Sequence, residues 1–392
     1  MLKQFFQQPH RSVARRFLFQ VHLWAGLLVG VHLAIVSLTG VVLLFKDEIQ
    51  GLSYPHLYSI GNDAADDTGS APVDFDRIIE SMSISFPDHR VIRVEAPKAQ
   101  RETAVIFAEK DWDFRRMYTH PLSGEILGEV PESFFLHYVD EFHASLFAGK
   151  IGRLANSTLA LLALLLVVSG LVIWWPGPRK WWRSLLPLTS NGQPSARSLH
   201  RSIGIWTFAF IAMFAATGAL FFFDRFLIPA VEMFSERSTP PAHYSTINPE
   251  TEGSRARIQP MIDRLEEESA GRLLWGVVFP EGERDPVNIV YGPVGRDIGR
   301  DRWDWDVSGQ RNFLFDQYSG EFLHQWDTSH RSLADIVLVW PAKLHTGEFG
   351  SFWAKLLWAV TGMAPVILFV LGFTMWWRRV IKPRRESQGN GR

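Results

Sequence analysis

The chain has 392 residues, 47% of them hydrophobic, and its formal net charge at pH 7 is −1. A charge so close to zero gives no reason to expect nucleic acid or another polyanion as a partner. The chain has no cysteine, which excludes disulfides, thiolate metal sites, iron–sulfur clusters and covalent haem attachment through C-x-x-C-H.

The apolar residues are concentrated in four runs, at about 17–45, 154–175, 203–223 and 354–377. Each run is long enough to cross a hydrocarbon core of about 30 Å, which takes roughly 20 helical residues. We therefore expect an α-helical membrane protein with four transmembrane helices. The first run is followed by charged residues (Lys46-Asp47-Glu48) instead of a small-residue cleavage site, so we interpret it as a retained signal anchor.

Basic residues flank the four runs on one side. They precede the first run, fill the short loop between the second and third, and follow the fourth: Arg15, Arg16, Arg179, Lys180, Arg183, Arg197, Arg201, Arg378, Arg379, Lys382, Arg384 and Arg385. Short loops rich in Lys and Arg stay in the cytoplasm. We therefore expect both termini in the cytoplasm and the two long segments outside it.

These observations divide the chain into nine segments. They are a cytoplasmic arm (1–16), a first transmembrane helix (17–45), a first outer module (46–136), a helical entry with the second transmembrane helix (137–175), a cytoplasmic loop (176–199), a third transmembrane helix (200–223), a second outer module (224–344), a fourth transmembrane helix (345–377) and a cytoplasmic tail (378–392).

The order of helix, outer module and helix occurs twice because two stretches of the sequence are duplicated. One stretch aligns with its copy without a gap, and the alignment matches His143 with His345, Gly170 with Gly372, and Trp174-Trp175 with Trp376-Trp377. A second duplicated stretch precedes each of these, and it matches His22 with His200 and Thr39-Gly40 with Thr217-Gly218. The sequence therefore predicts two tandem repeats.

Each outer module has the pattern of a helix followed by antiparallel strands, which is an α+β arrangement. The expected helices cover 75–86 and 258–268, and the expected strands lie near 91–94, 103–108, 115–118 and 125–130 in the first module and near 273–279, 287–291, 312–318 and 321–326 in the second. A Ser-Gly-Glu turn precedes the last strand of each module. Its glycine (Gly124 or Gly320) supplies the positive φ of a tight hairpin.

The duplication matches four histidines. It places His22 and His200 at the inner ends of spans one and three, and His143 and His345 at the outer ends of spans two and four. Two facing imidazoles on neighbouring helices are the simplest way for a bundle to hold a b-type haem without covalent attachment. The pattern therefore predicts two haem sites at two depths. Nearby small residues leave room for a macrocycle, although they also serve close helix packing: Gly26, Gly30, Gly40, Gly204 and Gly218.

Two further histidines need an explanation. His32 lies about 15 Å deeper in the first span than His22, and its counterpart in the second repeat is Phe210. An intramembrane histidine either hydrogen-bonds a neighbouring helix or has a function, here as a replacement or supplement for a haem ligand. His137 is six residues from His143, which puts the two on opposite sides of a helix and argues against a dedicated metal site.

Several motifs occur together in order: the H-x-W-x-G-L opening of the first span, LHRSIGIW in the third, the Ser-Gly-Glu hairpins, KLHTGE before the fourth, and the Trp-Trp endings. In these the chain resembles the PepSY-associated transmembrane family, and within it the FoxB-type ferric-siderophore reductases of Gram-negative inner membranes. The resemblance covers nearly the whole chain. It implies two periplasmic PepSY-like modules, two non-covalent b haems and four axial ligands, His22, His143, His200 and His345.

We therefore expect a haem-dependent reductase that acts on a periplasmic ferric siderophore and releases Fe(II) for iron uptake. Electrons would pass through haem, so no acid–base catalytic residues are required. There is no G-x-G-x-x-G after a strand and no P-loop, so a cytoplasmic reductase or a membrane quinol would supply the electrons. Two alternatives remain: a non-catalytic membrane module whose PepSY-like domains bind a peptidase or envelope partner, and a siderophore or metal permease.

Overall fold

The structure is a computed structural model of the chain. It describes residues 13–60, 73–97, 102–110, 113–131, 134–186, 189–190, 193–235, 255–265, 268–269, 272–292, 310–327, 332–347 and 352–381. The chain forms two compact units. The bundle unit comprises Met1–Phe45, Phe135–Met233 and Val337–Arg392, and the sheet unit comprises Lys46–Phe134 and Phe234–Ile336. Most of the expected arm (1–16) and tail (378–392) lies outside the described residues.

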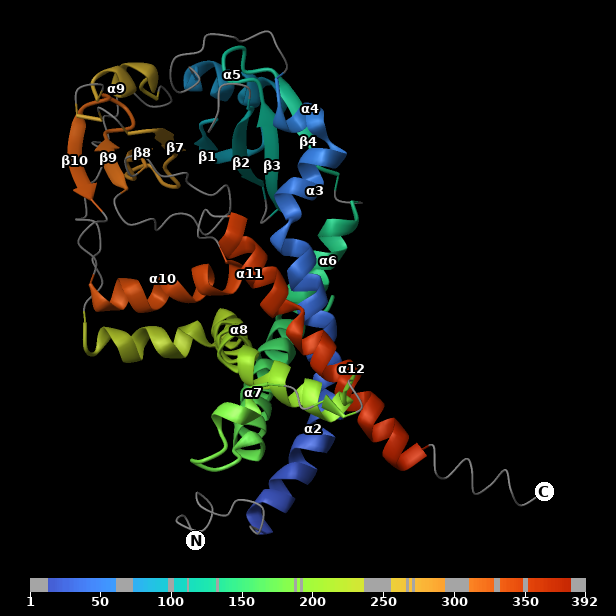
Figure 1. Ribbon diagram of the computed structural model, residues 1–392. Coiled ribbons are helices and arrows are strands. Elements are labelled where there is room, and N and C mark those ends of the chain that lie inside the picture. Colours follow the sequence, from blue (N-terminus) through green and yellow to red (C-terminus); the bar gives the residue numbers. More distant parts are fainter. Residues whose placement is uncertain are drawn as a thin grey trace. The chain divides into compact units, whose positions relative to one another are not determined.

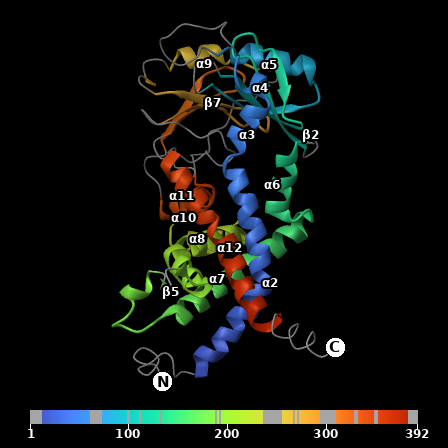
Figure 2. The ribbon, with the colours of Figure 1, turned by 45° about the vertical axis from the view of Figure 1, so that its right-hand side comes forward.

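The described part of the bundle unit contains four helical segments long and apolar enough to cross a membrane, as the sequence predicts: Arg15–Leu44, Gly149–Trp174, Ala196–Asp224 and Phe352–Ile381. They belong to α2 (Val13–Leu44), α7 (Gly149–Trp174), α8 (Ala196–Glu232) and the consecutive α11 (Phe352–Gly362), α12 (Ala364–Trp376) and a π-helical turn (Trp377–Ile381). α2 and α8 each pack against both α7 and α12 (Figures 1 and 2). The four therefore form one bundle.

The fourth span is bent. α11 ends at Gly362 and α12 begins at Ala364, with Met363 between them. Pro365 lies in the first turn of α12, and because proline has no N–H it cannot complete the hydrogen bonding of the preceding turn. The bend is thus explained by a single proline.

Two shorter helices carry histidines and precede the second and fourth spans: α6 (Phe135–Ser145) and α10 (Leu333–Thr346). Leu146 and Phe147, with positive φ values of 51° and 60°, turn the chain from α6 into α7, and Gly347, with a φ of 74°, follows α10. The span expected to begin at residue 345 therefore begins at Phe352. His345 lies on the short helix before it, as His143 does in the first repeat.

The sheet unit is built on eight antiparallel strands in the order β10-β9-β8-β7-β1-β2-β3-β4. The first module supplies β1 (Arg90–Glu95), β2 (Ala104–Lys110), β3 (Asp113–Thr119) and β4 (Ile126–Glu129), and the second supplies β7 (Leu274–Val278), β8 (Val287–Tyr291), β9 (Arg311–Phe315) and β10 (Phe322–Asp327). The short helices α3 (Lys46–Ser53) and α4 (Pro55–Tyr58) also belong to this unit, whereas a 3-10 turn (Trp182–Ser184), β5 (Thr189–Ser190) and β6 (Gln193–Pro194) belong to the bundle unit.

The two modules, expected as separate α+β units, join into one sheet through β1 and β7. Val94 pairs with Val277, and Glu95 pairs with Gly276. A Cβ atom at Gly276 would lie 2.3 Å from the carbonyl oxygen of Val94, so only glycine allows this approach. Pairing the two edge strands satisfies backbone groups that each module alone would leave exposed. The sequence pattern of an edge strand does not show which other strand it will pair with.

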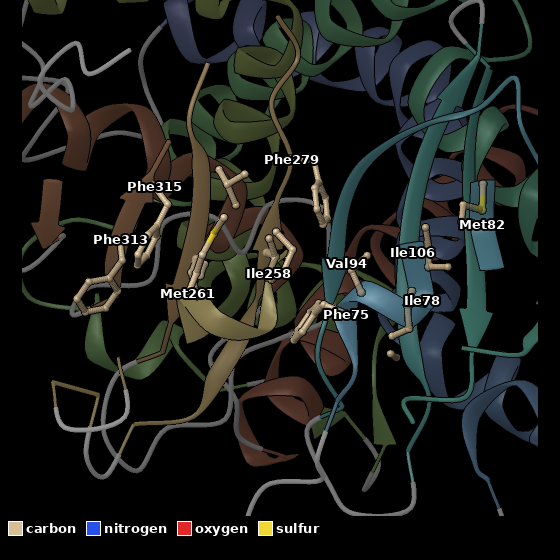
Figure 3. Close-up of a cluster of buried hydrophobic side chains, with 14 of the residues drawn as sticks. Phe75, Ile78, Met82, Val94, Ile106, Ile258, Met261, Phe279, Phe313 and Phe315 are labelled. Carbon is tan, nitrogen blue, oxygen red and sulfur yellow. The ribbon is translucent and has the colours of Figure 1, made fainter. Parts of the chain in front are cut away.

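One hydrophobic core spans both modules. α5 (Phe75–Ser85) and α9 (Gln259–Asp263) lie on the same side of the sheet (Figures 1 and 2). Figure 3 shows their buried side chains against those of the strands: Phe75, Ile78, Met82, Val94 and Ile106 from the first module, and Ile258, Met261, Phe279, Phe313 and Phe315 from the second. The helix expected over 258–268 is shorter, since α9 ends at Asp263.

A carboxylate and two glycines complete the sheet unit. Asp76 of α5 accepts hydrogen bonds from the backbone N–H groups of Ile258 (2.7 Å) and Gln259 (3.2 Å), so one module caps the helix of the other.

The glycines of the two Ser-Gly-Glu hairpins, Gly124 and Gly320, have φ values of 70° and 71°. The positive φ expected in both hairpins is confirmed.

Candidate functional site

The structure brings His143 and His345 together. Their ring centroids are 6.0 Å apart, with an angle of 58° between the ring planes. Two imidazoles bound to opposite sides of one metal ion, with bonds of about 2 Å, have centroids roughly 6 Å apart. The observed separation therefore suits two axial ligands of one iron.

Hydrogen bonds at Nδ1 fix the orientation of both rings. His143 Nδ1 lies 3.0 Å from the carbonyl oxygen of Val36 and 3.1 Å from Thr39 Oγ1. His345 Nδ1 lies 2.9 Å from Thr217 Oγ1, and His345 also hydrogen-bonds the backbone of Phe214. A carbonyl only accepts, so Nδ1 of His143 carries the proton and Nε2 keeps its lone pair. This arrangement is typical of metal-binding histidines.

Both rings of this pair are in the form that binds a metal. His143 and His345 lie outside the four spans, and burial lowers the pKa of each below its ordinary value. The neighbouring His143 lowers the pKa of His345 further. Both imidazoles are therefore neutral at pH 7, and neutral imidazole is the metal ligand.

His22 of α2 and His200 of α8 form the other matched pair. The two imidazoles are close enough to interact electrostatically. His200 Nδ1 lies 3.0 Å from the carbonyl oxygen of Leu368, and His22 hydrogen-bonds the backbone of Leu166, the residue that matches Leu368. The two pairs therefore follow one rule, in which each histidine is held by a backbone group of another helix.

A glycine lies against each of the four rings. A Cβ atom added there would lie 3.0 Å (Gly40), 3.2 Å (Gly218), 3.1 Å (Gly170) or 3.6 Å (Gly372) from Cε1 of His143, His345, His22 or His200, respectively. Contacts of 3.0–3.2 Å are tighter than side chains normally make. The duplicated glycines thus leave room for the duplicated histidines. By contrast, Gly26, Gly30 and Gly204 lie nearest to Leu166, Phe369 and Leu368, so these glycines serve helix packing.

His32 does not join either pair. Its Nε2 lies 3.0 Å from Asn156 Oδ1, and Asn156 Nδ2 donates to the carbonyl oxygen of His143 at 2.6 Å. His137 is exposed on α6. In the described ranges, no three His, Asp or Glu side chains are close enough to hold a metal ion.

The residues that support the site were not identified from the sequence. Thr39 and Thr217 are matched by the duplication, which is the signal that could have given them a role, but their spacing gives no sign of the ring that each contacts. Asn156 has no such signal because it matches Trp358. Its role depends on a contact between helices.

The sheet unit also contains a cross-strand row formed by Arg93, Phe107 and Arg116. The Arg93 guanidinium lies 3.8 Å from the centroid of the Phe107 ring. Arg93 is 2.8 Å from a Glu95 carboxylate oxygen, and Arg116 is 3.8 Å from an Asp47 carboxylate oxygen. Each cation has an acidic neighbour, so the row carries no excess charge that would mark an anion site.

The paired histidines, each held at Nδ1 and each against a glycine, occur in a chain that matches the model of the PepSY-associated TM region over residues 19–379. The chain belongs to the PepSY-associated transmembrane family. No curated protein matches the chain. Family membership thus supports the four-span architecture and leaves the chemistry to be argued from the site.

Proposed function

We propose that this PepSY-associated transmembrane protein is an inner-membrane di-haem electron carrier that reduces a ferric siderophore on the periplasmic side. The observation that carries the proposal is the convergence of the four duplicated histidines into two pairs. In each pair both rings are oriented by hydrogen bonds from another helix, and one pair has the 6.0 Å separation of two axial ligands. Histidines needed only to tie helices together would have no reason to face one another in pairs.

The residues present fit two b-type haems. His22 and His200 would hold one, and His143 and His345 the other. When bound, the haems supply the one-electron redox chemistry that this protein's side chains lack. The chain's own residues orient the ligands: Val36 and Thr39 position His143, Thr217 positions His345, and Leu368 positions His200. Position, not acid–base catalysis, is their contribution.

The proposed substrate follows from iron chemistry. Hydroxamate and catecholate oxygens are hard ligands that hold Fe(III) more tightly than Fe(II). Transfer of one electron to the chelated Fe(III) therefore weakens every iron–oxygen bond and releases Fe(II) for uptake. In this proposal the His143 and His345 pair faces the periplasm, as the distribution of basic residues predicts.

Two other functions are less well supported. In a non-catalytic PepSY module, the hydrogen bonds from the histidines to the backbone of neighbouring helices would simply join those helices. This reading accounts for those hydrogen bonds but not for the paired rings. A permease would be expected to have several broken helices near the midplane. In the described spans α2, α7 and α8 are uninterrupted, and the fourth is interrupted where Pro365 begins α12.

Absorption spectroscopy with anaerobic mixing tests the proposal. Purified protein should show a Soret band and sharp reduced α and β bands, and after reduction by dithionite a ferric hydroxamate siderophore should re-oxidise it. The gallium(III) complex of the same siderophore is the control, because it has similar shape and charge but no accessible reduction. Colourless protein would contradict the haem assignment. Coloured protein that does not respond to the ferric complex would contradict the substrate class.

A further inference from the structure

The two halves of the bundle differ at one pair of matched positions. His32 of α2 matches Phe210 of α8, and Asn156 of α7 matches Trp358 of α11. In the second half the Phe210 and Trp358 rings pack edge to face, with centroids 5.8 Å apart. In the first half His32 and Asn156 form a hydrogen bond. A polar contact in the first half thus takes the place that an aromatic contact has in the second.

Asn156 and Trp358 share a structural task that does not require His32. Asn156 Nδ2 donates to the carbonyl oxygen of His143 (2.6 Å), and Trp358 Nε1 donates to that of Leu344 (2.8 Å). Each therefore satisfies a carbonyl near the end of a histidine-bearing helix. The second half does so with an apolar neighbour, Phe210. An ionisable side chain within a span is costly, so His32 indicates a function beyond packing.

Hydrogen bonding fixes the tautomer of His32. Since Asn156 Nδ2 faces the carbonyl oxygen of His143, Asn156 Oδ1 is the atom that faces His32. An amide oxygen only accepts, so His32 Nε2 carries the proton and Nδ1 has the lone pair. In the described part of the chain, the hydrogen-bond partner of His32 is Asn156, and it contacts Nε2, not Nδ1. His32 therefore presents an uncommitted acceptor.

His32 lies on a stripe of α2 that is open at the bundle surface. Leu28, one turn before it, is 75% exposed, and Ile35, one turn after it, is 45% exposed. Both are apolar and lie within a span, so acyl chains would cover them. A lipid-soluble ligand can reach His32 from the bilayer, whereas a water-soluble reductase cannot.

We propose that His32 and Asn156 form the binding site for the head group of a membrane quinol, the electron donor. This inference rests on the proposed function. A quinol hydroxyl is the donor that His32 Nδ1 lacks, and the isoprenoid tail of a quinol partitions into lipid. Asn156 contacts both His32 and the backbone of His143. The head group is thus one side chain away from the residue that would hold a haem.

The redox step balances with two one-electron acceptors. Breaking both O–H bonds of the quinol yields the quinone, two protons and two electrons. One proton goes to His32 Nδ1 and the other to water, and His32 then returns its proton to water. The two electrons would pass to the two haems that the four matched histidines would hold, one to each. The chain itself supplies the hydrogen-bond acceptor and the position of the head group.

Calorimetric titration of the purified full-length protein with decylubiquinol, under anaerobic conditions and with the protein already reduced by dithionite, tests the site without requiring turnover. His32→Phe is the informative variant because phenylalanine is the residue at the matched position in the second half. His137→Phe, at an exposed histidine of α6, is the matched control. We expect wild type and His137→Phe to bind the quinol and His32→Phe to bind it at least tenfold more weakly. Decylubiquinol should likewise reduce the Soret chromophore of wild type at least tenfold faster than that of His32→Phe, with dithionite reduction unchanged.

Each outcome supports or refutes the quinol site, the haem proposal or both. Equal binding by wild type and His32→Phe, or no binding by wild type, overturns the quinol site. The Soret band is read in the same samples and reports the proposed haem function separately. Coloured protein that does not bind the quinol refutes the site and leaves the haem proposal standing, with a water-soluble donor in its place. Colourless protein that binds the quinol through His32 keeps the binding site but refutes its role as electron entry.

Discussion

The bundle unit and the sheet unit both contain two copies of a repeated stretch, but they use the duplication differently. In the bundle unit, matched side chains lie near one another: the His143 and His345 rings are 6.0 Å apart, and His22 and His200 are near enough to interact electrostatically. In the sheet unit, matched modules meet through their backbones, with β1 paired to β7, and share one core. Duplication therefore supplies ligands in pairs in one unit and closes exposed strand edges in the other. Substitutions in the bundle unit should therefore reduce haem binding, whereas substitutions at the strand junction should destabilise the sheet.

Removing a ligand should have the largest effect. His345→Ala should leave His143 without its partner and abolish one of the two proposed haems, so the haem content per chain should fall by about half. The sheet unit should be unaffected. Pyridine haemochrome analysis measures the content, and His137→Ala is the control because His137 is exposed and contacts neither pair. Unchanged haem content in His345→Ala would refute the assignment of this ligand.

Breaking the junction of the two modules should destabilise the sheet unit and leave the haem content unchanged. In Gly276→Val the new side chain would begin 2.3 Å from the carbonyl oxygen of Val94, which should destabilise the sheet unit by about 2–4 kcal/mol. Hydrogen exchange should show lost protection in β1 and β7, while the haem content of the bundle stays as in wild type. Gly282→Ala, where the nearest atom is a flexible Asp285 side chain at 3.3 Å, is the control. Full protection in Gly276→Val would show that the strands do not pair as described.

Crowding a ligand should have a graded effect. Gly40→Ala places a methyl group 3.0 Å from His143 Cε1, whereas Gly372→Ala places one 3.6 Å from His200 Cε1, an ordinary contact. We expect Gly40→Ala to shift the reduction potential or the α band of one haem and Gly372→Ala to leave both unchanged. Potentiometric titration followed in the visible spectrum measures the shift. Equal behaviour of the two variants would mean that the glycines do not set the positions of the rings.

The smallest expected effect concerns the threonines. Thr217→Val keeps the shape of the side chain but removes the hydroxyl, which lies 2.9 Å from His345 Nδ1, while the backbone hydrogen bond to Phe214 remains. Loss of such a supporting contact typically costs metal affinity about 10–100-fold, and the remaining bond should place this variant at the low end. Competition with apomyoglobin measures haem affinity. Thr207→Val, whose hydroxyl bonds only the backbone of its own helix, is the matched control, and equal affinities in the two variants would refute a role for Thr217.

Sequence periodicity and repetition predicted much of this architecture. The four spans were predicted from uninterrupted apolar runs, and the strands from short alternating segments, because these signals are local. The pairing of β1 with β7 was not predicted, since an edge strand does not encode its partner. The start of the fourth span was placed too early: the apolar run begins near residue 354, but the match between His143 and His345 led us to begin the segment at residue 345, which lies on α10.

The candidate site was predicted in part, and for a physical reason. Duplication identified His22, His143, His200 and His345 before any contact was known, and the structure shows that they lie in pairs. Duplication could not identify Asn156, because polar contacts between helices depend on the rotation of one helix against another. His32 was recognised as unmatched, yet its meaning depends on the equally unmatched residue it contacts.

The central claim is that the four duplicated histidines form two bis-imidazole haem sites. Near-infrared magnetic circular dichroism of the oxidised wild-type protein, combined with its haem content, tests this most directly because the low-spin band position reports both axial ligands. The account predicts two b haems per chain, both with bis-histidine ligation. Purified, folded protein with no haem, or haem with a single histidine ligand, would contradict it.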